Sequence, residues 1–112
     1  MRRRSGSRRR VARSVMPTHE ERGRFLREWA KLTVREQALF LAAVEEMVAD
    51  LRTHGSFRSS LRVKGVQGHP GVFEMTWAPD GRATFTYGTE VHPGEPHIIW
   101  RRIGGHEILA QP

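Results

Sequence analysis

A histidine and an arginine near the C-terminus form the most chemically suggestive pattern in this sequence. His106 follows Gly104 and Gly105, which allow the chain to turn sharply and present an imidazole at the end of a predicted strand. Imidazole titrates near neutral pH, so His106 is the first candidate for a general acid or base. Arg102 lies four residues earlier, and its guanidinium could stabilise charge on a phosphate under attack.

Other charged residues could complete such a site. Arg82 is the second candidate for contacting a reacting phosphate and Lys64 is the third. Glu74 could act as a base or orient an arginine. We expect Arg62 to contact phosphate groups without taking part in the chemistry, and we keep Arg101 as a reserve phosphate ligand.

Simpler structural explanations exist for the same residues. An arbitrary loop histidine such as His106 is most often solvated or structural. Arg102 could pair with Glu107, and Glu74 could pair with Arg82 across a hairpin. An exposed pair of that kind contributes less than about 1 kcal/mol to stability.

The histidines do not predict a metal site. The spacing of His92, His97 and His106 fits no structural zinc pattern, and the segment between the first two is rich in proline and glycine. We therefore expect neither a metal nor a cofactor, and His97 remains a reserve catalytic candidate.

Length and composition limit the possible classes of protein. A chain of 112 residues and 12.9 kDa is long enough for one core and too short for two. It has no cysteine, which excludes disulfides, thiolate zinc sites and a cysteine nucleophile. No apolar stretch reaches the roughly 20 residues of a membrane span, and no signal-peptide core is present. We expect a cytoplasmic protein with no membrane partner.

The charge of the chain is concentrated in its N-terminal tail. The formal net charge is +7, and seven arginines lie within residues 1–13 without any acidic residue. Removing them leaves 12 basic and 12 acidic residues in 14–112. We interpret residues 1–15 as a disordered basic extension, which could bind phosphates non-specifically or could precede a true start at Met16. Residues 16–112 are predicted to form a single domain.

Two helices are predicted in the first half of this domain. Thr18 and Glu21 have the spacing of a capping box, as do Thr33 and Glu36. The first helix should begin near Thr18 and the second should end near Arg52. Apolar residues recur at helical spacing in both: Phe25, Leu26, Trp29 and Leu32 in the first, and Phe40, Val44, Met47 and Leu51 in the second.

The second half predicts an antiparallel sheet. Residues 72–77 and 82–87 alternate in polarity, and the turn Pro79-Asp80-Gly81 between them is typical of a hairpin. A third strand is expected at 97–103, and a short strand or turn at 107–109. The predicted fold class is α+β: a two-helix hairpin packed on one face of a small, mostly antiparallel sheet of three to four strands.

The alternation also assigns side chains to the two sheet faces. Phe73, Met75 and Trp77 should face the helices, leaving an open face that carries Glu74, Thr76, Arg82, Thr84 and Thr86. The third strand has two possible registers. Either Ile99 and Ile103 face the core together with Arg101, or Ile98 and Trp100 face it together with Arg102.

Residues 17–109 resemble the RelE/ParE superfamily of toxins from type II toxin–antitoxin systems. The similar segments, in order, are FLREWAKL, VADL, LRVKGVQGHPGVFEMTW, DGRATFTYG and WRRIGGHEIL. The most specific is Arg102-x-Gly104-x-His106, which is similar to the RelE/HigB/YafQ-like branch. The first strand of that family has only a weak counterpart here, in residues 11–16.

The resemblance implies a toxin that is silenced by a cognate antitoxin protein and that cleaves mRNA in the ribosomal A site. The ribose 2′-OH would attack the adjacent phosphate, with His106, Arg102, Arg82 and Glu74 as catalytic residues and Lys64, Arg62 and Arg101 contacting phosphates. ParE-like members instead poison DNA gyrase without needing a histidine, and an inactive relic that only binds its antitoxin is a third alternative. Because residues 14–112 have no net charge, we expect the ribosome to help position the message.

Overall fold

A five-stranded sheet forms the centre of the molecule. The computed structural model describes residues 16–53 and 55–112, and the predicted basic extension 1–15 lies outside them. The strand order is β1-β5-β4-β3-β2, and all neighbours are antiparallel except β1 and β5. The strands are β1 Thr18–Glu21, β2 Lys64–Gly65, β3 Phe73–Thr76, β4 Arg82–Tyr87 and β5 His97–Gly104.

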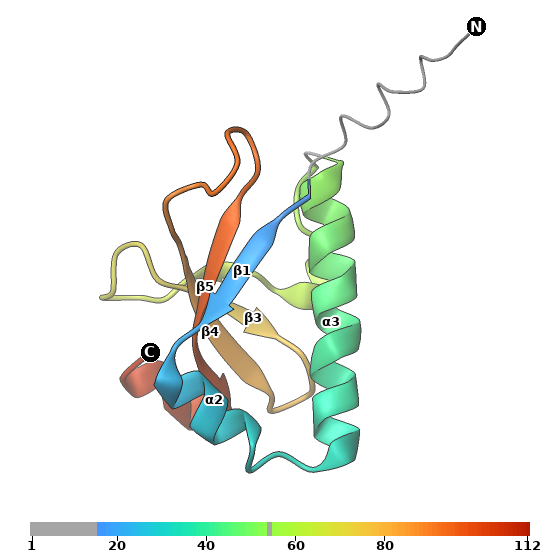
Figure 1. The fold of residues 1–112 in the computed structure, drawn as a ribbon. Helices are drawn as coiled ribbons and strands as arrows, with labels where there is room; N and C mark the ends of the chain where they lie inside the picture. The colour runs from blue at the N-terminus through green and yellow to red at the C-terminus, as the bar shows by residue number, and fades with distance from the viewer. Residues whose placement is uncertain (1–15, 54) are drawn as a thin grey trace, which may run out of the picture.

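The helices pack along this sheet (Figure 1). They are α2 Gly23–Trp29 and α3 Val34–Arg52, with short 3-10 turns η2 Ser59–Leu61 and η3 His106–Ala110. The predicted α+β class and the helical hairpin are confirmed. The sheet has five strands, whereas three to four were predicted. Within the described residues, no helix has the length and hydropathy needed to cross a bilayer.

The extra strand corrects the prediction that Thr18 begins a helix. Thr18–Glu21 is β1, parallel to β5, and the helix α2 begins only at Gly23. The backbone N–H of Thr18 donates to the Pro96 carbonyl, and that of Arg22 donates to the Trp100 carbonyl. These bonds to a distant strand replace the local bonds of a capping box. The weak first strand expected at 11–16 lies, apart from Met16, outside the described residues.

The second capping box is confirmed. The Thr33 hydroxyl accepts a hydrogen bond from the Glu36 N–H at 3.0 Å, and the Glu36 carboxylate accepts one from the Thr33 N–H at 2.8 Å. The helix that follows ends at Arg52, as predicted. Its apolar face supplies the buried residues Phe40 and Met47 to the core.

Aromatic rings connect the helices to the sheet. Phe40 of α3 packs edge-on against Trp77 and Trp100, with ring centroids 6.5 and 5.1 Å away. Phe25 of α2 lies 6.0 Å from Trp100, which also contacts Phe85 of β4. Trp100 is therefore a core residue, and contacts of this kind stabilise the packing beyond the area that they bury.

A β-bulge in β5 resolves its register. Phe85 pairs with Trp100 whereas Thr84 pairs with Arg102, so Arg101 is the extra residue. The bulge shifts the alternation by one position and allows Trp100 and Ile103 both to be buried in the core. Each of the two registers predicted from the sequence is therefore correct for half of the strand.

The sheet face opposite the helices is less open than predicted. Thr84 of β4 is fully buried, and η3 lies against β4 and β5. Glu74 of β3 is 7% exposed, and its carboxylate lies beside the Arg82 guanidinium. Ile108 of η3 is buried, and a Cβ atom at Gly104 would come within 2.9 Å of it. The C-terminal segment, predicted as a short strand or turn, is thus a 3-10 turn that covers part of this face.

Candidate functional site

His106 is exposed at the first position of η3. Its backbone N–H donates to Asp80 Oδ1 at 3.4 Å, and the N–H of Gly105 donates to Glu107 Oε2 at 3.3 Å. A Cβ at position 105 would lie 2.6 Å from a carboxylate oxygen of each acid. The missing side chain of Gly105 therefore allows two carboxylates to approach the backbone next to His106.

Asp80 was not among the residues predicted for the site. The sequence indicated only its role in the Pro79-Asp80-Gly81 turn, which the structure confirms with a hydrogen bond from the Gly81 N–H to the Ala78 carbonyl. Its approach to His106 depends on the pairing of β4 with β5, since Arg82 lies opposite Gly104. The proximity of this turn to the C-terminal histidine follows from sheet register.

Arg102 is held by a carboxylate of α2. Its Nη2 and Nε atoms lie 2.5 and 3.1 Å from Glu28 Oε2, and its Nη1 donates to the Gln111 carbonyl at 3.1 Å. Glu28 also accepts the backbone N–H of Ile103 at 3.2 Å. The predicted pairing with Glu107 is wrong. The last residue of β1 pairs with Trp100, so the edge of β5 beyond Trp100 has no strand beside it, and Glu28 of α2 contacts that edge instead. In this structure Arg102 joins β5 to α2.

Arg82 and Glu74 form the pair that the sequence offered as an alternative to catalysis. Arg82 Nε lies 3.8 Å from Glu74 Oε1, and both side chains are largely buried. Arg82 Nη1 also donates to the carbonyls of Pro79 and Gly81, at 3.3 and 3.0 Å. The guanidinium thus turns back onto the hairpin turn.

Lys64 and Arg62 are exposed on the β2 side of the sheet. Strand pairing places Lys64, Glu74, Thr84 and Arg102 in one row across four strands. Their side chains do not converge on His106, since no hydrogen bond or ion pair joins its ring to any of them within the described residues. Lys64, Glu74 and Arg102 thus lie on one face of the sheet, but the structure does not bring them together with His106 in one cluster.

His97 has a structural environment. It is buried between β1 and β5, with Nδ1 2.7 Å from Thr18 Oγ1 and Nε2 2.9 Å from Glu20 Oε1. The side chain therefore joins the two parallel strands. In the parts of the chain that the structure describes, no three histidine or acidic side chains gather closely enough to hold a metal ion.

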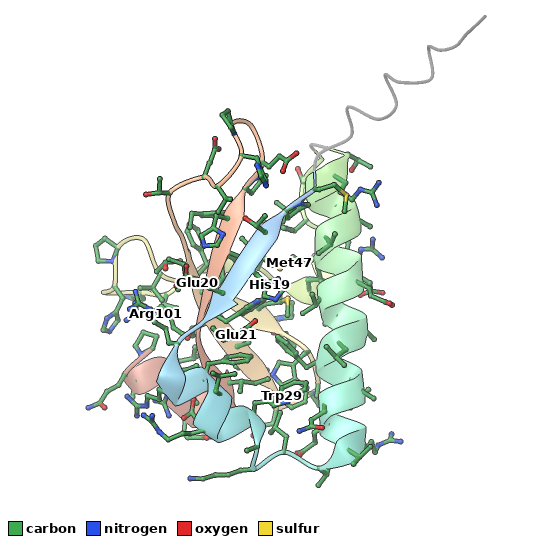
Figure 2. All side chains as sticks on the ribbon, in the orientation of Figure 1. His19, Glu20, Glu21, Trp29, Met47 and Arg101 are labelled. Carbon is green, nitrogen blue, oxygen red and sulfur yellow. The ribbon has the colours of Figure 1, made fainter. Side chains whose placement is uncertain are left out.

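A basic cavity of about 420 Å³ opens beside β5. Its lining comes from four separate segments: Arg22, Arg24, His69, Arg101, Arg102, Gln111 and Pro112. Arg101, predicted as a reserve phosphate ligand, lies at this site near the C-terminal end of the chain (Figure 2). Sequence reasoning missed Arg22, Arg24 and His69, which no local motif connects with β5.

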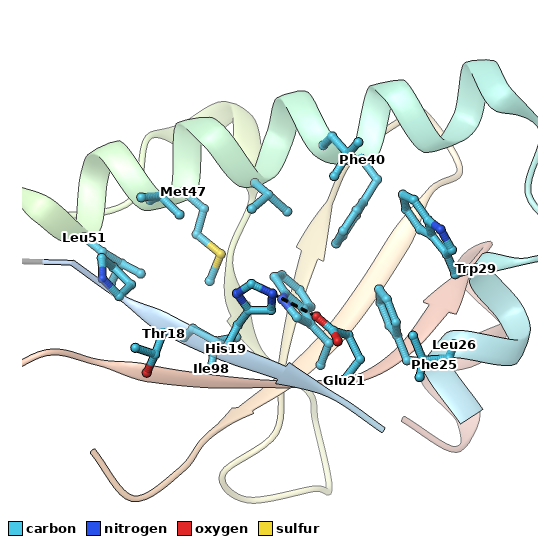
Figure 3. A pocket seen from close by; sticks show the side chains of 15 residues that line it. Thr18, His19, Glu21, Phe25, Leu26, Trp29, Phe40, Met47, Leu51 and Ile98 are labelled. Atoms are coloured by element: carbon cyan, nitrogen blue, oxygen red, sulfur yellow. Dashed lines mark ion pairs between the residues drawn. The ribbon is translucent and has the colours of Figure 1, made fainter. Parts of the chain in front are cut away.

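An apolar cavity of about 260 Å³ lies on the helical side of the sheet (Figure 3). Side chains of β1, α2 and α3 line it, among them Phe25, Trp29 and Phe40. Among its few polar groups are His19 and Glu21, whose Nε2 and Oε2 atoms are 3.0 Å apart. This lining suits burial of an apolar group better than acid–base chemistry.

Solved structures share this architecture at low sequence identity. YafQ from E. coli strain BL21(DE3) matches with a TM-score of 0.57 and 13% identity, over 83% of this chain and 97% of that chain. YafQ in the E. coli DinJ–YafQ toxin–antitoxin complex matches at 0.55 and 13%, over 85% and 98%.

The RelB–RelE antitoxin–toxin complex from Methanococcus jannaschii matches with a TM-score of 0.54 and 12% identity, over 81% of this chain and 94% of that chain. No protein-family model and no curated protein sequence matches this chain. The order of its elements and these structural matches give the same result: the chain has the α+β fold of the YafQ and RelE toxins.

Proposed function

We propose that this protein is the toxin of a type II toxin–antitoxin system, that it acts in the cytoplasm, and that it cleaves mRNA on the ribosome. The observation that carries the proposal is the position of His106, an exposed imidazole at the start of η3. The shared fold supports it, since the structural neighbours are described as toxins, two of them in complex with an antitoxin. A cognate antitoxin is the expected protein partner.

In the proposed reaction, the ribose 2′-oxygen attacks the phosphorus of the adjacent phosphodiester. The 2′-oxygen forms a new bond to phosphorus while the bond from phosphorus to the 5′-oxygen breaks. A base removes the 2′-OH proton and an acid protonates the departing 5′-oxygen. His106 serves as one of these groups, and the Asp80 carboxylate that accepts its backbone N–H fixes the start of η3.

The cations divide into two groups in this proposal. Arg102 and Arg82 position the site, because each guanidinium is already engaged by a carboxylate and by at least one backbone carbonyl. Lys64 and Arg62 are exposed and form no ion pair with a described residue. They are available to contact phosphates of a bound message, as the sequence predicted.

The charge balance supports participation of the ribosome. Residues 14–112 carry 12 basic and 12 acidic residues, whereas a protein that binds RNA unaided usually has a strongly basic surface. Rapid cleavage of free RNA by the purified chain would contradict this part of the proposal.

The experiment is transcript mapping by primer extension after brief induction of the full chain in a bacterial host. His106→Ala is compared with the parent and with His92→Ala, which removes an exposed loop histidine. We expect cuts within translated codons for the parent and the His92 variant, and none for His106→Ala. Growth arrest with intact transcripts would overturn the nuclease and favour a gyrase poison, and absence of arrest would favour an inactive relic.

A further inference from the structure

The edge strand β1 directs two polar side chains toward the helices. His19 and Glu21 alternate along β1 with Thr18 and Glu20, whose side chains contact His97 on the other side of the sheet. Figure 3 shows His19 and Glu21 projecting from β1 into the apolar cavity on the helical side. A strand position that faces the core normally carries an apolar residue, so a polar side chain there is the informative exception.

Glu21 gives this cavity a negative charge that its lining does not balance. Among the described residues that line the cavity there is neither a lysine nor an arginine. His19 Nε2 lies 3.0 Å from Glu21 Oε2, and the side chains of His19 and Glu21 are 64% and 31% exposed. The other oxygen, Glu21 Oε1, makes no hydrogen bond or ion pair with a described residue. A partly buried carboxylate of this kind is stabilised by a donor that carries positive charge.

Aromatic rings form much of the wall around this carboxylate. Phe25, Trp29, Phe40 and Trp100 all line the cavity. The Phe25 and Trp29 rings are stacked, with centroids 6.3 Å apart, and Phe40 lies 5.7 Å from each of them. The face of an aromatic ring attracts a cation that lies within about 6 Å of its centroid. The rings and the carboxylate therefore favour an organic cation with an apolar body over an anion or a neutral molecule.

The size of the cavity indicates a small ligand. Its volume is about 260 Å³, and an apolar cavity of roughly 150 Å³ is large enough for a benzene ring. There is thus room for one ring and a short alkyl chain. A helix with its side chains is about 10–12 Å across, so it could cover the cavity but could not enter it. The exposed side chains of Leu26 and Leu41 belong to the lining, so the cavity is open to solvent.

We propose that this cavity binds a small hydrophobic amine. The ammonium group donates to Glu21 Oε1, and the apolar part of the ligand packs among Phe25, Trp29 and Phe40. A bound amine connects β1, α2 and α3, and it stabilises the folded chain because the unfolded chain has no such site. The site goes beyond the proposed function and does not depend on it, since neither His106 nor any other residue of η3 lines the cavity.

The probe is 2-phenylethylamine, compared at neutral pH with 2-phenylethanol and phenylacetate, which replace the ammonium group by a neutral and an anionic group. Binding to the full chain, labelled with ¹⁵N, is followed by NMR through the indole N–H signals. Trp29 and Trp100 line the cavity, whereas Trp77 does not and serves as an internal control. The test variant is Glu21→Gln, which keeps the size of the side chain. The matched control is Glu45→Gln, which changes an exposed residue of α3 outside the lining.

We expect the parent to bind the amine about tenfold more tightly than the alcohol, because a hydrogen bond between two charged groups is stronger than one to a neutral group. Phenylacetate should bind most weakly. Glu21→Gln should lose the preference for the amine and Glu45→Gln should keep it, with shifts at Trp29 and Trp100 and none at Trp77. The amine should also raise the Tm of the parent. Equal affinity for the amine and the alcohol, or an undiminished preference in Glu21→Gln, would overturn the proposal.

A second variant tests the position of the ligand. Val44→Phe adds a ring to the lining from α3 and, in a protein whose circular dichroism is unchanged, should abolish binding of both the amine and the alcohol. Retained binding would place the ligand elsewhere and overturn the site. Tighter binding of the capped tripeptide Leu-Lys-Leu than of the amine would also overturn the proposal, in favour of a protein segment. His106→Ala should bind the amine like the parent, so failure of the proposed nuclease and failure of this site are distinguishable.

Discussion

Removal of the Glu28 carboxylate should destabilise the protein far more than removal of an ordinary surface acid. Glu28 accepts bonds from Arg102 and from the backbone N–H of Ile103. Its side chain is 18% exposed and that of Arg102 is 14% exposed. Loss of one partner of a buried pair costs about 3–5 kcal/mol, because the other charge is left without compensation.

Both side chains retain some contact with water, so the lower end of this range applies. We expect Glu28→Ala to lower the free energy of unfolding by about 3 kcal/mol, with a fall in Tm of roughly 10–20 °C for a domain of this size. Glu28→Gln keeps an oxygen that can accept the Ile103 N–H, and should cost about 1–2 kcal/mol.

The assay is urea unfolding followed by circular dichroism, with Glu45→Ala as the control. Glu45 is exposed on α3, and its removal should change the free energy of unfolding by less than about 0.5 kcal/mol. In a double-mutant cycle with Arg102→Ala, the two losses should be less than additive, since each removes the same interaction. A loss below about 1 kcal/mol for Glu28→Ala would show that the pair behaves like an exposed one and would refute the reasoning.

Two further predictions concern α3. Hydrogen bonds from the Arg58 side chain, followed by the one from its backbone, lower the pKa of the Asp50 carboxyl below its usual value of 3.8. The stability contributed by the ionised form is therefore present above pH 3.8 and is lost as the pH falls through the lower folded-state pKa. Asp50→Asn should flatten the acid side of the stability profile measured by thermal unfolding, and an unchanged profile would contradict this. Thr33→Ala removes the hydroxyl that accepts the Glu36 N–H and should cost about 1 kcal/mol in urea unfolding, whereas a loss below about 0.3 kcal/mol would show that the cap adds little.

The sequence predicted the elements whose stabilising contacts lie close along the chain. The helix from Thr33 to Arg52 was predicted because its cap and its apolar face depend on residues three or four positions apart. The β3–β4 hairpin was predicted from its alternation and from the turn at Pro79-Asp80-Gly81. Among the site residues, the exposure of His106 and the pairing of Glu74 with Arg82 were foreseen as possibilities.

Other features depended on partners that local patterns do not reveal. Thr18 is in a strand because β5 lies beside it, and its hydroxyl meets a histidine 79 residues away. Arg102 pairs with Glu28, 74 residues earlier in the chain, and not with the nearby Glu107 that the sequence offered as a partner. The bulge at Arg101 was hidden because the sequence allows either register with equal ease.

The sequence by itself therefore determined the α3 helix, the β3–β4 hairpin and an α+β class, because capping and periodicity depend on residues that lie only a few positions apart. Only the tertiary structure decided which charged side chains are paired with one another. Arg102 and Arg82 are engaged by carboxylates, while Arg22 and Arg101 border a basic cavity. The physical reason is that an ion pair depends on distance in space, which the packing of α2 against β5 sets and the spacing of residues along the chain does not.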